Sequence, residues 1–183
     1  MACHLAGFKK LPMENFTNDT IDTTQLPKFE QVPMSGLHRS YWKVILINIA
    51  ILLIVFCAVY VFTFAYIEEL DQYHTETAVG LAILMFLITV FSRIGYKKKG
   101  FAFREHDVLF RHGVIATNTM VIPYNRIQHV ALHEGLIPRL FGLVKIEIFT
   151  AGGHSSDIEI PGIEKMQAQN IKQLLMGKIQ KEL

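Results

Sequence analysis

The most restrictive feature of the sequence is an uncharged run of about 24 residues, Val44 to Ile67, which reads VILINIAILLIVFCAVYVFTFAYI. As an α-helix rising 1.5 Å per residue it would span about 36 Å, more than the roughly 30 Å hydrocarbon core of a bilayer. Tyr41 and Trp42 precede the run and Tyr66 lies at its far end, as aromatic residues do at membrane interfaces. A buried helix of a soluble protein rarely stays uncharged for so long, and a cleaved signal peptide has a far shorter preceding segment. The run therefore predicts a transmembrane helix.

A second apolar run, Thr77 to Ser92, has about 16 residues, which is short for a span by itself. Arg93 can extend its side chain to the interface, and apolar and aromatic residues after it lengthen the run. The linker between the two runs is short and acidic. We therefore expect an antiparallel membrane hairpin in residues 41–96, with helices over 44–67 and 77–95.

Charged residues are distributed unevenly around the two runs. The linker contains four acidic residues and no Lys or Arg, whereas basic residues flank the outer ends of both runs: His38, Arg39, Lys43, Arg93, Lys97, Lys98, Lys99 and Arg104. Positively charged flanks of membrane helices remain on the cytoplasmic side. We therefore expect a multi-pass protein of the plasma (inner) membrane with both termini in the cytoplasm.

Residues 1–40 contain three prolines and many Asn, Asp and Thr residues without a sustained periodicity, which is typical of a disordered tail. Met1 and Met13 are alternative translation starts, because the sequence from Met13 resembles a native N-terminus. The formal net charge of +2 is too small to indicate nucleic-acid binding, and no nucleic-acid partner is expected.

From Gly100 onward the hydrophobic periodicity becomes that of β-strands. Six short β-like runs are separated by turn-forming residues: 101–103, 108–110, 119–122, 127–132, 144–149 and 158–160. Residues 134–142 are expected to form a turn with a short helix. Residues 164–183 predict an amphipathic helix with Ala168, Ile171, Leu174, Leu175 and Ile179 on its apolar face. Residues 97–183 thus predict an α+β domain, a small antiparallel β-barrel or sandwich capped by the C-terminal helix.

Several motifs in this region match a known pattern in their order and spacing. They are HDVLFRHGVI, IPYNRIQHV at residues 122–130, RLFGL at 139–143, TAGG at 150–153, and the terminal helix. Together they resemble the bacterial pleckstrin-homology-like (PH-like) domain of the YdbS-like membrane proteins, over most of residues 95–180. The resemblance implies a partly open β-barrel of about seven strands attached to the inner face of the plasma membrane. It implies no reaction, and bacterial PH-like domains tend to self-assemble or to bind proteins.

The residues capable of chemistry do not form a recognisable catalytic or metal-binding set. His129 and His133 lie in a predicted strand, where four residues separate the Cα atoms by about 13 Å, too far to share a metal ion. The motif G-x-S-x-G is absent, so the Ser155-Ser156 pair is expected in a hairpin loop. Asp157 and Glu159 are expected at a solvated strand end rather than in an acid–base pair. No cofactor or metal is therefore expected.

The membrane runs contain no Asp, Glu, Lys or Arg, which argues against transport by the hairpin alone. A small membrane hydrolase or a transporter subunit is accordingly the least favoured hypothesis. The preferred hypothesis is a membrane-anchored, non-enzymatic module whose groove or edge strand binds a second PH-like membrane protein or another copy of itself. Arg126, Gln128 and Arg139 are the candidate partner-binding residues. The alternative is that the two arginines only hold loops by binding backbone carbonyls.

The alternative function is an anionic-lipid or envelope-stress sensing component. In that case Lys97, Lys98 and Lys99 would contact lipid head groups, at about 1 kcal/mol per basic residue. The same three lysines are also explained by membrane topology alone. Membrane lipids are expected as partners under either hypothesis.

Overall fold

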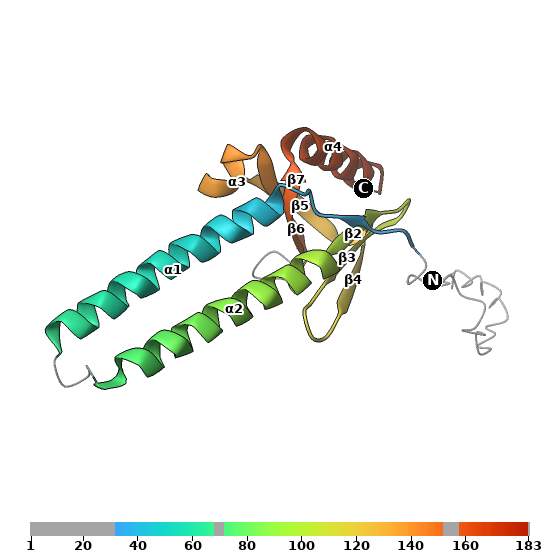
Figure 1. Cartoon of the computed structure of the whole chain (residues 1–183). Helices are drawn as coiled ribbons and strands as arrows, with labels where there is room; N and C mark the ends of the chain where they lie inside the picture. Colours follow the sequence, from blue (N-terminus) through green and yellow to red (C-terminus); the bar gives the residue numbers. More distant parts are fainter. Residues whose placement is uncertain (1–31, 68–71, 152–157, 183) are drawn as a thin grey trace, which may run out of the picture. The chain divides into compact units, whose positions relative to one another are not determined.

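The computed structural model describes residues 32–67, 72–151 and 158–182 (Figure 1). In chain order the elements are β1 (Ser35–Gly36), α1 (Tyr41–Tyr66), α2 (His74–Lys98), β2 (Gly100–Phe103), β3 (Asp107–His112), β4 (Asn118–Pro123), the 3-10 helix η4 (Tyr124–Arg126), β5 (Ile127–His133), α3 (Leu136–Leu140), β6 (Leu143–Thr150), β7 (Ile158–Glu164) and α4 (Lys165–Glu182). Two apolar helices are followed by antiparallel strands and a C-terminal helix, so the predicted fold class is confirmed.

The two long helices, α1 and α2, are apolar and leave most of their side chains uncovered. Their mean hydropathies reach 3.0 and 2.1, and both are long enough to cross a membrane. Ile54 is 66% exposed and Phe62 is 65% exposed. A helix satisfies its own backbone hydrogen bonds, so an apolar helix with uncovered side chains is suited to lipid as solvent.

Both helices extend beyond the apolar runs by which they were predicted. The predicted bounds were 44–67 and 77–95, whereas α1 begins at Tyr41 and α2 extends from His74 to Lys98. Polar and charged residues at a helix end continue the helical hydrogen bonding although they do not belong to the apolar run. Hydropathy therefore locates the apolar part of each helix but does not locate the residues at which the helix begins and ends.

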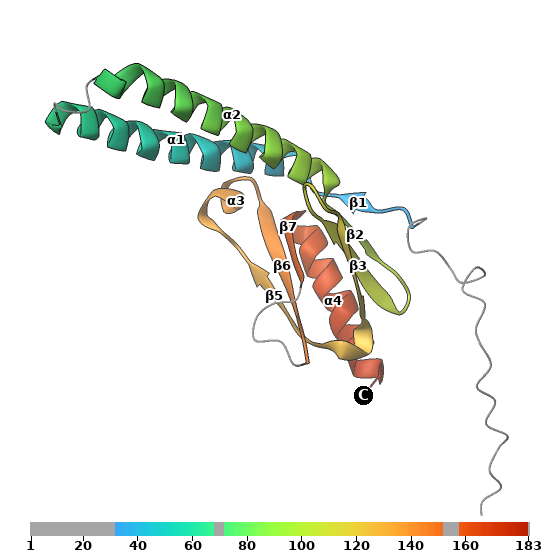
Figure 2. The ribbon, with the colours of Figure 1, turned by 90° about the horizontal axis from the view of Figure 1, so that it is seen from below.

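The β domain consists of two antiparallel sheets with strand orders β1-β2-β3-β4 and β5-β6-β7 (Figure 2). All six predicted β-like runs are strands, and the predicted short helix is α3. The pairing places Phe101 opposite Phe110 in the first sheet and Val130 opposite Ile148 in the second. The register of the second sheet shifts between Ile127 and His129 and again between Val144 and Ile146, as at a β-bulge.

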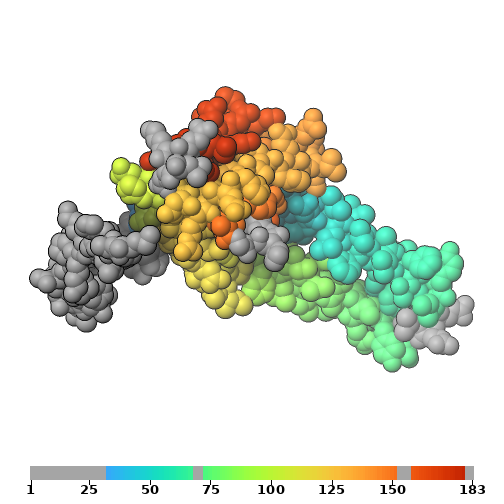
Figure 3. Space-filling view, turned by 180° about the vertical axis from the view of Figure 1, so that it is seen from behind, coloured from blue at the N-terminus to red at the C-terminus, as the bar shows by residue number. Residues whose placement is uncertain are grey.

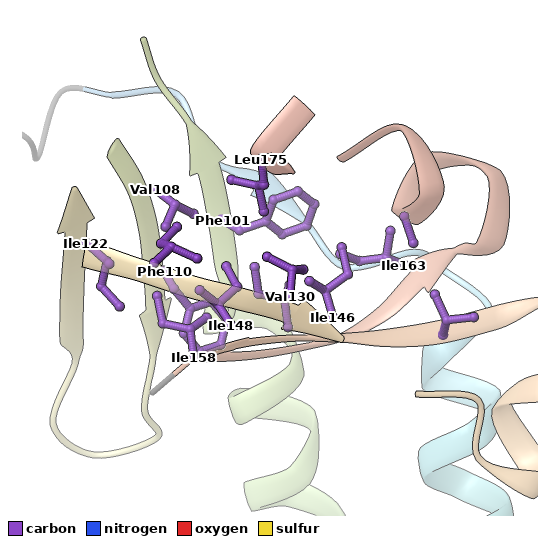
Figure 4. Close-up of a cluster of buried hydrophobic side chains, with 14 of the residues drawn as sticks. Phe101, Val108, Phe110, Ile122, Val130, Ile146, Ile148, Ile158, Ile163 and Leu175 are labelled. Atoms are coloured by element: carbon purple, nitrogen blue, oxygen red, sulfur yellow. The ribbon is translucent and has the colours of Figure 1, made fainter. Parts of the chain in front are cut away.

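The core of the β domain lies between the two sheets and is closed by α4. Phe110 from the first sheet, Ile146 and Ile148 from the second and Leu175 from α4 point toward one another (Figure 4). Ile146, Ile148 and Leu175 have no exposed surface. Burying each such side chain stabilises the fold by about 1.5–3 kcal/mol.

The apolar face of α4 is narrower than predicted. Ala168 and Leu175 are fully buried, and Ile171 and Ile179 pack against the core. Leu174, predicted on the same face, is 47% exposed. Consecutive residues of a helix are about 100° apart around its axis, so Leu174 lies to the side of the buried stripe that contains Leu175.

An additional strand, β1, lies within the segment predicted to be a disordered tail. Ser35 pairs with Phe101 and Gly36 with Gly100, and the next residue, Leu37, is 9% exposed within the core. The prediction for residues 1–40 is therefore wrong for this last part, while residues 1–31 lie outside the described residues. The β domain includes chain from both sides of the helix hairpin.

The start of α1 is joined to the β domain at Gly162 of β7. The His38 amide donates to the Gly162 carbonyl at 3.0 Å, and the Tyr96 hydroxyl donates to the His38 carbonyl at 3.3 Å. Gly162 has φ +67°, and a Cβ placed on it would lie 2.4 Å from Cγ of Tyr41. Only glycine satisfies both the backbone conformation and the close approach of the tyrosine.

The ends of the two helices are also held to each other. The guanidinium of Arg93 lies 4.6 Å from the centre of the Trp42 ring and 5.7 Å from that of Tyr96. The Trp42 and Tyr96 rings are 5.8 Å apart. A cation over aromatic rings stabilises such a contact by about 0.5–2 kcal/mol. This arrangement fixes the base of the hairpin beside the β domain.

Candidate functional site

β5 is an edge strand of the second sheet and lies beside the C-terminal helix α4. β5 pairs with β6 on one side, and no other strand of the described part of the chain pairs with its second side. Helix α4 packs against β5, β6 and η4. An unpaired strand edge presents backbone donors and acceptors on which another strand can form.

A hollow of about 350 Å³ lies at the start of this edge, between η4, β5 and the end of α4. Its lining residues are Tyr124, Asn125, Arg126, Ile127, Gln128, Ala151 and Ile179. Arg126 also borders a neighbouring hollow of about 400 Å³ along β4. The structure thus brings two of the three predicted partner-binding residues, Arg126 and Gln128, together at one exposed place.

The third predicted residue, Arg139, lies elsewhere. It is exposed on α3, beyond the opposite end of β5, so that most of the roughly 20 Å length of the strand separates it from Gln128. Among the described residues, neither Arg126 nor Arg139 donates a side-chain hydrogen bond to a backbone carbonyl. The predicted set is therefore divided between the two ends of the β domain.

The floor of the hollow beside β5 is held by hydrogen bonds that sequence reasoning missed. Tyr124 is fully buried, and its hydroxyl donates to the Arg104 carbonyl at 2.6 Å. Burial raises the pKa of Tyr124, so the phenol stays protonated as a donor. Arg104 also forms a two-point ion pair with Asp107, with Nε to Oδ1 at 2.6 Å. Lys178 of α4 donates to the Glu105 carbonyl at 2.9 Å and so ties α4 to the β2–β3 turn.

The three predicted lipid-contacting lysines lie at the end of α2 and border a hollow of about 340 Å³. The lining includes Lys97, Lys98, Lys99, Gly100, Arg111, Thr117, Met34 and Gly36. Arg111 was not predicted, because nothing in its own stretch of sequence indicates that β3 lies beside the end of α2. Four cationic side chains around one hollow favour an anionic group such as a phosphate.

These lysines have different surroundings. Lys97 and Lys98 are exposed, and the Lys98 ammonium donates to the Val114 carbonyl at 2.7 Å. Lys99 is half-buried, and burial lowers its pKa while the nearby Glu159 acts in the opposite direction. Lys99 also borders a hollow of about 370 Å³ with Tyr41 and Glu159 among its lining residues. Only the first two lysines therefore face outward as a basic surface.

The residues considered for catalysis or metal binding fall in separate places. His129 and His133 lie on β5, the predicted strand, and the His129 ring stacks on Phe149 with the centres 4.1 Å apart. Glu159 forms an ion pair with Lys145, with Oε2 3.1 Å from Nζ. Asp157 and the serine pair at 155–156 lie outside the described residues. Within the described ranges, no three His, Cys, Asp or Glu side chains converge on a possible metal position.

Two apolar membrane helices joined to a two-sheet domain with a C-terminal helix define a membrane protein with a PH-like domain. The sequence profile of the bacterial PH domain matches residues 21–179, which is most of the chain. The chain belongs to the bacterial PH domain family. The resemblance inferred from the motifs is thereby confirmed.

Two relatives from Bacillus subtilis (strain 168) are similar to this chain. It is 27% identical over 121 residues to the transmembrane protein YdbT, covering 64% of this chain and 24% of YdbT. It is 25% identical over 88 residues to the transmembrane protein YdbS, covering 47% of this chain and 54% of YdbS. The chain therefore matches about a quarter and about half of the lengths of these relatives. No solved structure matches the chain.

Proposed function

We propose that this protein is a membrane-anchored, non-enzymatic interaction module on the cytoplasmic face, which binds another PH-like membrane protein or a second copy of itself through the open edge of β5. The observation that carries the proposal is the unpaired edge of β5 beside the hollow with Arg126 and Gln128. A partner segment would add a strand to this edge through main-chain hydrogen bonds. Side chains of the partner would enter the hollow and supply specificity.

The chemistry of the hollow supports binding of a peptide segment. Arg126 and Gln128 are exposed hydrogen-bond donors suited to carbonyl and carboxylate oxygens. Ile179, which is partly exposed, offers apolar surface beside them. Because the tie from Lys178 and the Tyr124 hydrogen bond hold the floor in place, little ordering entropy would be lost when a segment binds.

Cytoplasmic placement is supported by the distribution of charge. Lys97 and Lys98 at the end of α2, and Arg39 just before α1, lie at the end of the hairpin that joins the β domain. The four acidic residues fall in the sequence between the two membrane runs, where there is no Lys or Arg. By the positive-inside rule, the β domain then faces the cytoplasm.

The experiment is photo-crosslinking of the full-length protein in its native membranes. A photoreactive amino acid replaces Gln128 in one variant. In the control variant it replaces Lys172, an exposed residue of α4 that does not line the hollow. We expect a discrete adduct, either a dimer of the chain or one partner, from position 128 and none from position 172. Adding Arg126→Glu should reduce the adduct about tenfold, equivalent to about 1.4 kcal/mol of lost binding free energy.

Two results would contradict this proposal. One is an equal yield of the same adduct from positions 128 and 172. The other is the absence of any adduct from position 128 in membranes where the variant accumulates to the normal level. An adduct whose yield does not change with Arg126→Glu would remove Arg126 from the site while leaving the β5 edge in place.

The second candidate function is recognition of anionic lipid, supported by the basic hollow at the end of α2. Lys97, Lys98 and Arg111 lie around it at the level where lipid phosphates meet a spanning helix. Native mass spectrometry of the detergent-solubilised chain would show retained anionic lipid, reduced by Arg111→Gln. Equal retention by both proteins would count against this function.

A further inference from the structure

The β domain exposes three large apolar side chains far more than its other apolar residues. Ile115 and Leu136 are each 89% exposed and Leu140 is 80% exposed, whereas the next described apolar residue of the domain, Met166, is 64% exposed. Ile115 lies in the turn between β3 and β4. Leu136 and Leu140 are one helical turn apart on α3. We call these segments the two apolar tips.

The β3–β4 tip lies directly against α2. A Cβ placed on Gly95 would be 3.2 Å from Cγ2 of Val114, the neighbour of Ile115, and the Lys98 ammonium binds the Val114 carbonyl at 2.7 Å. Gly95 lies three residues before the end of α2, about 4.5 Å along the helix axis. From the C-terminal end of α2 this tip therefore reaches back along the helix toward its membrane-spanning part.

The second tip, α3, lies alongside the other helix of the hairpin. It contacts α1 and is seen beside the first turns of α1 in ribbon and space-filling views (Figures 1 and 3). The two tips thus lie beside different helices, one next to α2 and the other next to α1. Figure 2 shows both tips on the side of the β domain that is next to the two long helices.

We infer that both apolar tips enter the interfacial layer of the bilayer and hold the β domain against the membrane surface. Ile115 on one tip and Leu136 and Leu140 on the other would bury apolar surface among the lipid head groups and upper acyl chains. Cationic side chains accompany both tips: Arg139 on α3, and Lys98 beside the β3–β4 turn. Apolar side chains with adjacent basic groups are the composition of segments that lie in this layer.

Continuity with the hairpin is the reason for choosing lipid over a protein as the occupant. Val114 touches the same α2 surface whose neighbouring side chains, such as Phe91 and Ile94, are exposed for contact with lipid. Trp42 and Arg93 mark the interfacial level on the helices themselves. Lipid that surrounds the helices at this level is therefore adjacent to both tips without any rearrangement.

The test uses spin labels on the full-length chain in nanodiscs that hold one copy each. Cys3 and Cys57 are replaced by Ser, and single cysteines are introduced as Ile115→Cys, Leu140→Cys and, as the control, Met176→Cys on α4. We expect the labels at 115 and 140 to collide with a water-soluble nickel chelate several-fold less often than the label at 176. They should also collide more often with oxygen, which concentrates in lipid.

All three positions are exposed, so the labels leave the core undisturbed, and near-ultraviolet circular dichroism verifies the fold of each variant. Equal nickel accessibility at 115, 140 and 176 would overturn the inference. Protection that occurs only in discs with two or more copies would also overturn it, because the occupant would then be a second chain. A failure of the crosslinking at position 128 would leave this result unaffected, since position 128 lies at the start of β5 and α3 follows the other end of that strand.

Discussion

The helix hairpin and the β domain use the same kinds of apolar side chain in opposite ways. Ile54 in α1 is 66% exposed, whereas Ile146 in β6 has no exposed surface. In the β domain, side chains are removed from water by packing against one another. In the hairpin the surrounding solvent is itself apolar, so each helix needs only its own backbone hydrogen bonds. Burial of a side chain within the chain is therefore a measure of its contribution to stability in the β domain and not in the hairpin.

The largest predicted difference comes from the same truncation made in both regions. Ile146→Ala should lower the free energy of unfolding by about 2–5 kcal/mol, because it leaves a cavity between the two sheets. Ile54→Ala should change it by less than about 1 kcal/mol, because lipid replaces the lost contacts. Pulse proteolysis in nanodiscs across a denaturant series measures both.

A similar cost for the two substitutions would show that Ile54 packs against protein. The helix hairpin would then be part of a larger assembly rather than surrounded by lipid. A small cost for Ile146→Ala would instead contradict the assigned core.

The junction between the two regions is tested at Gly162. Gly162→Ala should cost more than Gly142→Ala, although both glycines have a positive φ, +67° and +66°. The shared backbone strain is worth about 1–2 kcal/mol. At Gly162 the new methyl group also overlaps Tyr41, which adds about 1–3 kcal/mol to the cost. At Gly142 a Cβ meets no atom within 4 Å, so this second cost is absent.

Thermal unfolding of the two variants in the same detergent measures this difference. Tyr41→Ala in the Gly162→Ala background should recover part of the loss, because it removes the overlapping ring. Equal costs at the two glycines would mean that the start of α1 moves freely relative to β7.

The smallest predicted effect lies at Glu134, next to α3. Its carboxylate pairs with Lys165 at 2.6 Å, and this hydrogen bond lowers the pKa of Glu134. A carboxyl group whose pKa is lower in the folded state stabilises the protein at pH values above its unfolded-state pKa, which is near 4.5. This stabilisation is lost as the pH falls through the folded-state pKa. At pH 6 the melting temperature of the wild-type chain should therefore be slightly higher than that of the Glu134→Gln variant. In acid the two melting temperatures should be equal.

Glu164→Gln is the matched control, since Glu164 lies next to Lys165 in sequence and has no described ion pair. Its melting temperature should follow that of the wild type at both pH values. A constant offset for Glu134→Gln across the acid range would assign the effect to packing and not to charge.

The sequence was sufficient to predict those parts of the fold that depend on local pattern. Uncharged length predicted α1 and α2, and short β-like runs between turn-forming residues predicted β2 to β7. The strand β1 was missed because Ser35-Gly36 has no pattern of its own and is defined only by its pairing with Gly100 and Phe101. Leu174 was wrongly assigned to the buried face because the apolar residues of α4 cover a wider arc of the helix than the sheets bury.

The candidate site was predicted only where its residues are neighbours in the chain. Arg126 and Gln128 belong to one motif and lie in one hollow. Arg139 follows closely in sequence, but the length of β5 takes it to the other end of the domain. Arg111 of β3 lines the same hollow as Lys97 and Lys98 of α2, and no local signal in the sequence indicates that these two elements meet there.

The pairing of Gly36 with Gly100 has a consequence for the order in which the protein folds. The two residues lie on either side of the whole hairpin, so the intervening chain forms one long loop closed by β1 and β2. Closing such a loop in water would carry a large entropic cost, but two antiparallel helices inserted in the membrane already hold its ends together. We therefore expect membrane insertion to precede completion of the first sheet. A fragment that begins at Gly100 would lack β1 and Leu37, and would leave the edge of β2 open to aggregation.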